Sequence, residues 1–221
     1  MSVYRPHKIK CPECGEEGFQ MIWHSANVDS DPEIREKVKN GTLFAYTCEK
    51  CCKTFNVEYT FLYHDMKNKF MIYYITKPEI NTSFEDEINN SDAYELFSNQ
   101  GYTFRIVYDK VNLIDKIRIF ENGLNDIAVE ILKWIIKNNL PNDEVNNVNK
   151  IIFNKVENEN LVFSILFANN EQTKGAMLSK EGYENLLNDL KYNNYDKTKF
   201  LEINMDTVFQ YVEQWKHLIK Q

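Results

Sequence analysis

Four cysteines in two closely spaced pairs are the residues of this chain best suited to do chemistry. Cys11 and Cys14 lie in the segment CPECG, and Cys48 and Cys51 lie in CEKCC. A Cys-x-x-Cys step in a tight turn points both sulfur atoms at one spot, with backbone N–H groups directed towards them. Two such steps supply four thiolates, which can surround one zinc ion at Zn–S distances of about 2.3 Å. We therefore predict one structural Zn²⁺ bound by these four residues.

The predicted site is closed, because four sulfurs complete a tetrahedral shell and leave no position for water or substrate. Metal binding would then contribute to folding rather than to a reaction. The two pairs are separated by 33 residues, whereas about 15–20 are usual in such sites, so the spacing indicates an insertion. Two alternatives remain, a disulfide and a redox-active dithiol. A disulfide needs an oxidising compartment and a redox dithiol is typical of a βαβ pattern, and the sequence shows neither context.

The insertion carries the signals of a short helix. Asp31 is a suitable N-cap, Pro32 fits the first helical position, and lysines precede Gly41 near the expected C-terminus. These signals predict a helix over about residues 32–39, with Ile34 and Val38 on one face. We interpret residues 1–60 as a zinc ribbon into which this helix is inserted. Its strands are expected at residues 19–23, 43–47 and 55–59.

Several separated blocks of the sequence resemble the CpXC family, bacterial proteins named for their cysteine motifs and without an established biochemical function. The blocks are CPECG, NVDSDPEIREKVKNGTLF, CEKCCKTFNV, FLYHDMKNKFMIYYI and KIRIFENGLNDIAVEIL, within residues 8–137. The resemblance implies a metal-binding domain that uses Cys11, Cys14, Cys48 and Cys51, and it implies no activity. In the second motif, Cys52 takes the place that Gly15 holds after the first. If this place requires positive φ, the second turn is slightly strained.

The remaining pattern predicts an α+β protein in two parts. The first part is a CpXC-like zinc-binding domain, 1–139, in which the ribbon is followed by a mixed sheet and helices. A linker is expected at 140–149 and a small α+β C-terminal unit at 150–221. In the first part we expect a hairpin around DMKNK, a solvated acidic loop with a helical turn at 80–99, a strand in GYTFRIVYD and helices at 111–121 and 126–139. In the C-terminal unit we expect strands at 150–156, at 161–168 and in GAMLS, a helix capped by Ser179 and a last amphipathic helix from Val208 to Ile219.

Composition sets the class of protein. With 221 residues, 43% of them hydrophobic and 14% aromatic, the chain can bury one good core or two smaller ones. Its longest apolar runs, such as FMIYYI, are far shorter than the roughly 20 residues of a membrane span, and the N-terminus shows no charged-then-apolar leader. We expect a soluble cytoplasmic protein. That compartment keeps thiols reduced, which favours a metal over a disulfide.

Other reactive side chains are given structural roles. His64 and Asp65 are adjacent in LYHD, and neighbours on a strand face opposite sides, so we expect a role in the hairpin turn or beside another site rather than an acid–base pair. His7 and His24 lie near the cysteines, but four sulfurs already complete the shell. Cys52 is interpreted as a packed or spare cysteine rather than a reactive thiol.

The distribution of charged side chains distinguishes a nucleic-acid-binding protein from a protein-interaction module. Arg5, His7, Lys8 and Lys10, with Lys50 and Lys53, would suit a nucleic-acid-binding ribbon. Residues 1–60, however, carry 8 basic and 9 acidic side chains, and residues 61–221 carry 18 and 24. Binding of phosphates needs clustered positive charge. We therefore favour a protein-interaction or scaffold module that has an unknown protein partner and does not bind nucleic acid or membrane. The alternatives are the nucleic-acid-binding ribbon and an enzyme of unrecognised type.

Overall fold

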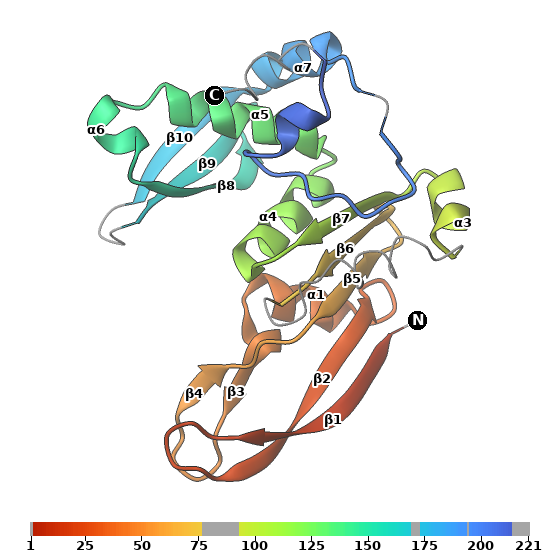
Figure 1. Cartoon of the computed structure of the whole chain (residues 1–221), viewed down its shortest axis with the longest axis vertical. Helices are drawn as coiled ribbons and strands as arrows, with labels where there is room; N and C mark the ends of the chain where they lie inside the picture. Colours follow the sequence, from red (N-terminus) through yellow and green to blue (C-terminus); the bar gives the residue numbers. More distant parts are fainter. Residues whose placement is uncertain (1, 77–92, 169–172, 194, 214–221) are drawn as a thin grey trace. The chain divides into compact units, whose positions relative to one another are not determined.

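A computed structural model describes the chain except for residues 1, 77–92, 169–172, 194 and 214–221 (Figure 1). The fold is α+β, as predicted. The chain divides into two compact units, residues 1–110 with 197–200, and residues 111–196 with 201–221. Each unit is described by itself below.

The first unit is built on a mixed five-stranded sheet in the order β1-β2-β5-β6-β7 (Figure 1). The pairs β1–β2 and β5–β6 are antiparallel, whereas β2–β5 and β6–β7 are parallel. The strands are β1 (Val3–Lys10), β2 (Glu17–Asn27), β5 (Phe61–Asp65), β6 (Phe70–Tyr74) and β7 (Thr103–Val107). Strands β5 and β6 form the hairpin predicted around DMKNK, and their aromatic and β-branched residues supply much of the buried surface of the sheet.

The connection from β2 to β5 contains the predicted insertion. It runs through α1 (Pro32–Lys39), the 3₁₀ turn η1 (Thr42–Phe44) and a short hairpin of β3 (Ala45–Thr47) and β4 (Thr54–Asn56). Helix α1 buries Ile34 and Val38 completely, as its pattern predicted. Phe44 follows in η1, and its ring packs edge-on against the rings of Phe61 and Tyr74. The insertion is therefore anchored in the core of the first unit.

The second unit combines helices with an antiparallel sheet in the order β10-β9-β8. Its core joins apolar residues of one long helix, such as Ile127 and Ile131, to Phe153 and Phe163 on the sheet. Asn125 caps that helix by accepting a hydrogen bond from the Ala128 amide at 3.1 Å. The elements are α4 (Lys110–Glu121), α5 (Asp126–Asn138), α6 (Asn142–Val145), β8 (Val148–Glu157), β9 (Asn160–Phe167), β10 (Thr173–Ser179), α7 (Lys180–Asp189) and the 3₁₀ turn η3 (Val208–Gln210). Ser179 caps α7, as predicted.

Several features differ from the sequence analysis. The strand expected at 43–47 begins only at Ala45, because Thr42–Phe44 form the 3₁₀ turn η1, and the strand expected at 55–59 ends at Asn56. Strand β1 precedes the first cysteine pair and was not predicted. The predicted linker, 140–149, contains α6 and the start of β8 and lies inside the second unit. The predicted last helix is wrong where it is described, because Val208–Gln210 form only a 3₁₀ turn and Val212 then bridges to Tyr192 in an extended arrangement. Its remainder lies outside the described residues.

The acidic stretch predicted as a loop is described only in part. Residues 77–92 lie outside the described residues. The end of the stretch forms α3 (Ala93–Asn99), which is longer than the single helical turn expected there.

The domain limits at 139 and 150 remain a prediction about which pieces of the chain fold independently.

Candidate metal centre

The four cysteines lie in two turns of matching geometry at the tips of two hairpins (Figure 1). Cys11 and Cys14 lie between β1 and β2, and Cys48 and Cys51 lie between β3 and β4. In the first turn the Gly15 amide donates to the Cys11 carbonyl at 3.0 Å, and in the second the equivalent amide donates to the Cys48 carbonyl at 2.9 Å. The two Cys-x-x-Cys steps therefore adopt the same local fold.

The residue after each pair has positive φ, as the sequence predicted. Gly15 has φ 72° and Cys52 has φ 58°. Glycine reaches this region without steric cost, whereas a residue with a Cβ atom does so at a penalty. The exposed Cys52 side chain is thus held on a strained backbone at the edge of the second turn.

The sulfur atoms of the two turns converge. The Sγ atoms of Cys11 and Cys51 lie 3.6 Å apart, as do those of Cys14 and Cys48, and all four lie within 4.8 Å of one another. A tetrahedral shell with Zn–S distances near 2.3 Å has sulfur–sulfur edges of about 3.8 Å, whereas a disulfide bond is about 2.0 Å long. The five cysteines are all free. The spacing therefore fits one shared ion and does not fit a disulfide.

Backbone N–H groups point at these sulfurs. The Glu16 amide donates to Cys14, and the amide at the equivalent place in the second turn, Lys53, donates to Cys51. Donation by the amide of Cys51 and then of Lys50 lowers the pKa of the Cys48 thiol to about 7. The Lys53 amide is the largest influence on Cys51 and lowers its pKa, but desolvation and the neighbouring sulfurs together raise it to about 12. The pKa values of Cys14 and Cys51 thus lie above the usual value, and a cation between the sulfurs would offset the charge of their thiolates.

Close packing of the two hairpins holds the turns together. A Cβ atom built on Gly18 in β2 would lie 1.9 Å from the Tyr46 hydroxyl of β3, so only glycine lets this side chain cross the strand. The Gln20 side chain of β2 donates to the Ala45 carbonyl at 3.2 Å. Lys50 and Glu16 form an ion pair of 2.8 Å between the two turns. Gly18 was not predicted to have this role, although a glycine inside a strand often marks such a close approach.

The other sequence candidates lie apart from the cluster. Asp65, fully buried, accepts hydrogen bonds from the backbone and side-chain amides of Asn68 and pairs with Arg35 at 3.1 Å, so it fixes the β5–β6 turn against α1. His64 is buried beside Tyr102, with 3.3 Å between its Nε2 and the hydroxyl, and burial lowers its pKa. The predicted hairpin-turn role is thus confirmed for Asp65.

Two further histidine candidates, His7 and His24, pack with ring centroids 5.5 Å apart and line a cavity of about 470 Å³. Neither belongs to the cysteine cluster. Among the residues that the structure describes, the four cysteines are the one group of Cys, His, Asp or Glu side chains whose ligand atoms converge as a metal site requires.

A network of buried charges in the second unit was missed by the sequence analysis. The Lys116 ammonium contacts Asp126 at 3.1 Å and Glu130 at 2.7 Å. The Lys133 ammonium contacts the same Glu130 carboxylate at 3.0 Å and also pairs with Asp115. All five residues are at most 4% exposed. Three carboxylates thus face two ammonium groups in the core between α4 and α5.

The network perturbs its own ionisation. Burial raises the pKa of Asp115, although the neighbouring Lys133 acts in the opposite direction. Glu130 is desolvated too, but the two lysines outweigh this effect and hold its pKa below the usual value. The sequence pattern did not indicate this burial, because Asp126, Glu130, Lys133 and Lys137 recur on one face of α5 with the spacing typical of a solvated polar stripe.

The fold and the cysteine cluster together define an α+β protein with a four-sulfur site suited to a metal ion. The model of the CpXC protein family matches residues 9–133, which include both cysteine pairs, and the chain belongs to this family. No curated protein and no solved structure shows significant similarity to the chain. None of the described helices combines the length and the apolar character needed to span a bilayer.

Proposed function

We propose that the cysteine cluster binds one Zn²⁺ and that the ion is structural. The observation that carries this proposal is the 3.6 Å spacing of sulfurs contributed in pairs by two separate turns. Four thiolates suit zinc and complete its tetrahedral shell, so the ion has no position at which to bind substrate. In this role Cys11, Cys14, Cys48 and Cys51 join the tips of the β1–β2 and β3–β4 hairpins.

A metal ion would stabilise the tips of the two hairpins, because these tips contain little apolar core. Strands β3 and β4 have three residues each, and a two-stranded hairpin of that length is not stable alone in water. Most of β1 is exposed. Cys11 and Cys48, in contrast, are each only 1% exposed. Zinc binding would therefore supply stability that side-chain burial does not supply here.

The first prediction concerns metal content. The full chain, expressed with ample zinc and purified without chelator, is expected to contain one zinc per chain by elemental analysis, because a single four-sulfur shell is present. Cys52→Ser is the matched control, since Cys52 is exposed and outside the cluster, and it should retain the metal. Iron in place of zinc, or less than about 0.2 equivalents of zinc, would contradict a closed zinc site of this kind.

We further propose that the protein works as a protein-interaction module. One face of the β1–β2 hairpin carries exposed apolar side chains, with Phe19 72%, Tyr4 50% and Met21 44% exposed. Register pairs place them on the same face, because Tyr4 lies opposite Trp23 and Pro6 opposite Met21. Contiguous exposed apolar side chains commonly mark sites of protein contact. This face is the strongest support for a protein partner.

A nucleic-acid partner is less well supported by the charges. Two of the basic residues near the cysteine turns are already paired, Lys8 with Glu17 and Lys50 with Glu16. The chain carries a net charge of −7. Release of counterions, which drives binding to phosphates, is therefore small.

The second prediction separates these two classes of partner. Titration of the full chain with labelled single- and double-stranded oligonucleotides at about 150 mM salt should show no binding tighter than roughly 1 μM. In a parallel pull-down from native extract, a specific protein should be retained by the wild type and lost with Phe19→Ser plus Met21→Ser. Met177→Ser, on another exposed methionine, is the control. Submicromolar oligonucleotide binding that falls with Arg5→Ala would reverse our preference.

A further inference from the structure

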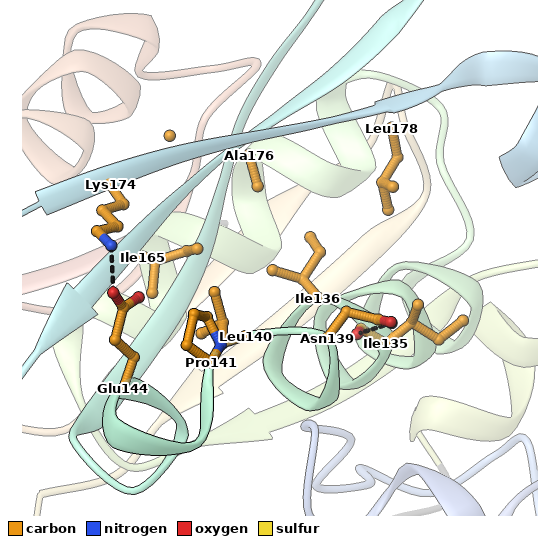
Figure 2. A pocket seen from close by; sticks show the side chains of 11 residues that line it. Ile135, Ile136, Asn139, Leu140, Pro141, Glu144, Ile165, Lys174, Ala176 and Leu178 are labelled. Atoms are coloured by element: carbon orange, nitrogen blue, oxygen red, sulfur yellow. Dashed lines mark hydrogen bonds and ion pairs between the residues drawn. The ribbon is translucent and has the colours of Figure 1, made fainter.

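The second unit contains an apolar cavity that the proposed zinc site does not use. Its volume is about 380 Å³. Figure 2 shows its walls: Ile135 and Ile136 come from the end of α5, Leu140 and Pro141 from the following connection, and further side chains from the sheet. This cavity lies outside residues 9–133, which the family model matches.

The cavity exists because a small side chain faces the end of a helix. Lys174, Ala176 and Leu178 alternate along β10 and lie opposite the buried Ile165, Phe163 and Leu161 of β9, so they face the core side of the sheet. Helix α5 ends at Asn138, and the chain then turns through Pro141 into α6. Between Ala176 and the last turn of α5, none of the residues that the structure describes fills the space with a large side chain (Figure 2).

One polar atom at the edge of this cavity lacks a partner. Glu144 of α6 pairs through Oε1 with the Lys174 ammonium (Figure 2). Its second oxygen, Oε2, is shielded from solvent and accepts no hydrogen bond from any residue that the structure describes. A shielded acceptor without a donor is unfavourable, and a donor on a bound molecule would remove that penalty. Because Lys174 already balances the carboxylate charge, a neutral donor suits this position better than a second cation.

We propose that the cavity binds a small amphipathic molecule with a hydrocarbon body and one neutral hydrogen-bond donor. A volume in the lower part of the usual range, an apolar lining and a few polar groups at one end are the properties of small-molecule sites. The hydrocarbon part contacts Ile136, Ile165 and Leu178. The hydroxyl or N–H group donates to Glu144 Oε2.

Two isomeric probes test this proposal. 1-Octanol and di-n-butyl ether share one formula, but only the alcohol has a donor. Each is titrated into the full chain with ¹³C-labelled isoleucine methyl groups and followed by NMR. 1-Octanol is expected to shift the methyl signals of Ile136 and Ile165 saturably, with a dissociation constant of about 0.1–1 mM. The ether should bind about fivefold more weakly, since it lacks one hydrogen bond.

Three variants locate the site. Ala176→Phe fills the cavity and should abolish the shifts for both probes. Met177→Phe lies on the opposite face of β10, at a residue that is 69% exposed, and should leave binding unchanged. Glu144→Leu removes the acceptor and should make the two probes bind equally. This variant decides the question alone if thermal melting shows that Ala176→Phe is unfolded.

Three results would overturn the proposal: no saturable shift up to the solubility limit of 1-octanol, equal affinity of the wild type for both probes, or octanol binding to folded Ala176→Phe with wild-type affinity.

Discussion

Lys133→Met is expected to lower the free energy of unfolding by about 3–5 kcal/mol, the usual effect of removing one partner from a buried ion pair. The Lys133 ammonium contacts both Asp115 and Glu130 in the core of the second unit. Without it, three buried carboxylates would face the single ammonium group of Lys116. Asp115 would then lose the ammonium group that offsets its desolvation, and Glu130 would share Lys116 with Asp126.

Glu130→Gln provides the informative comparison. It leaves two neutral pairs, Lys133 with Asp115 and Lys116 with Asp126. We therefore expect it to be clearly less destabilising than Lys133→Met, although both remove charged contacts. Lys137→Met, on the same helix but outside the network, should change stability by no more than about 0.5 kcal/mol. Chemical unfolding of the full chain, followed by far-ultraviolet circular dichroism, measures all three.

The pH dependence has a definite sign. Burial raises the folded-state pKa of Asp115 above its usual value, so folding favours the protonated form of this carboxyl. Removing the Lys133 ammonium would raise this pKa further. The loss of unfolding free energy caused by Lys133→Met should accordingly be largest at neutral pH and should shrink as acidification protonates Asp115. If Lys133→Met lowered the free energy of unfolding by less than about 1 kcal/mol at pH 7, or by the same amount as Glu130→Gln, the proposed balance of three carboxylates against two ammonium groups would be wrong.

The second large effect is expected for the cysteine turns. Cys48→Ser or Cys14→Ser removes one thiolate of the proposed zinc shell. Zinc affinity should fall by more than about 100-fold, beyond the usual effect of changing an outer neighbour of a ligand. The β1–β2 and β3–β4 tips should then lose ordered structure, because metal binding and folding are coupled in such sites.

The measurement combines chelator competition with amide NMR spectra. Loss of zinc should coincide with collapse of amide dispersion for residues of the two tips. Cys52→Ser keeps all four sulfurs of the cluster and should retain both zinc and the spectrum. If Cys52→Ser alone released the metal, our ligand assignment would be wrong. If Cys48→Ser lost zinc without disorder of the tips, the ion would bind but would not be structural.

Local chemistry explains which parts of the structure were predictable from sequence. The cysteine turns, the helix at Pro32–Lys39, the cap of α7 and the positive φ at Cys52 depend on a few neighbouring residues, and the structure agrees with these expectations. Asp31 occupies the N-cap position of α1 as predicted, but its side chain makes no capping hydrogen bond. Strand β1 was missed because it is an exposed strand containing Pro6 and shows no apolar alternation. Its pairing with β2 is a tertiary property that its own pattern does not encode.

The errors in the second unit have a similar origin. Val208 and Val212 have helical spacing, yet they are fully buried in an irregular segment. An apolar stripe indicates burial but does not by itself establish a regular helix. The sequence analysis gave the charged residues of α4 and α5 no role, and only packing shows that Lys116 and Lys133 share the Glu130 carboxylate inside the core.

The long segment between the two cysteine pairs has a consequence for chain entropy. A metal shared by the two turns would close a loop around 33 residues instead of the more usual 15–20. Because closure entropy grows only with the logarithm of loop length, doubling the loop costs about 0.6 kcal/mol. Complete burial of Ile34 and Val38 contributes about 1.5–3 kcal/mol for each side chain. The free energy gained by burying these two side chains therefore exceeds the additional cost in loop-closure entropy that comes from the longer segment.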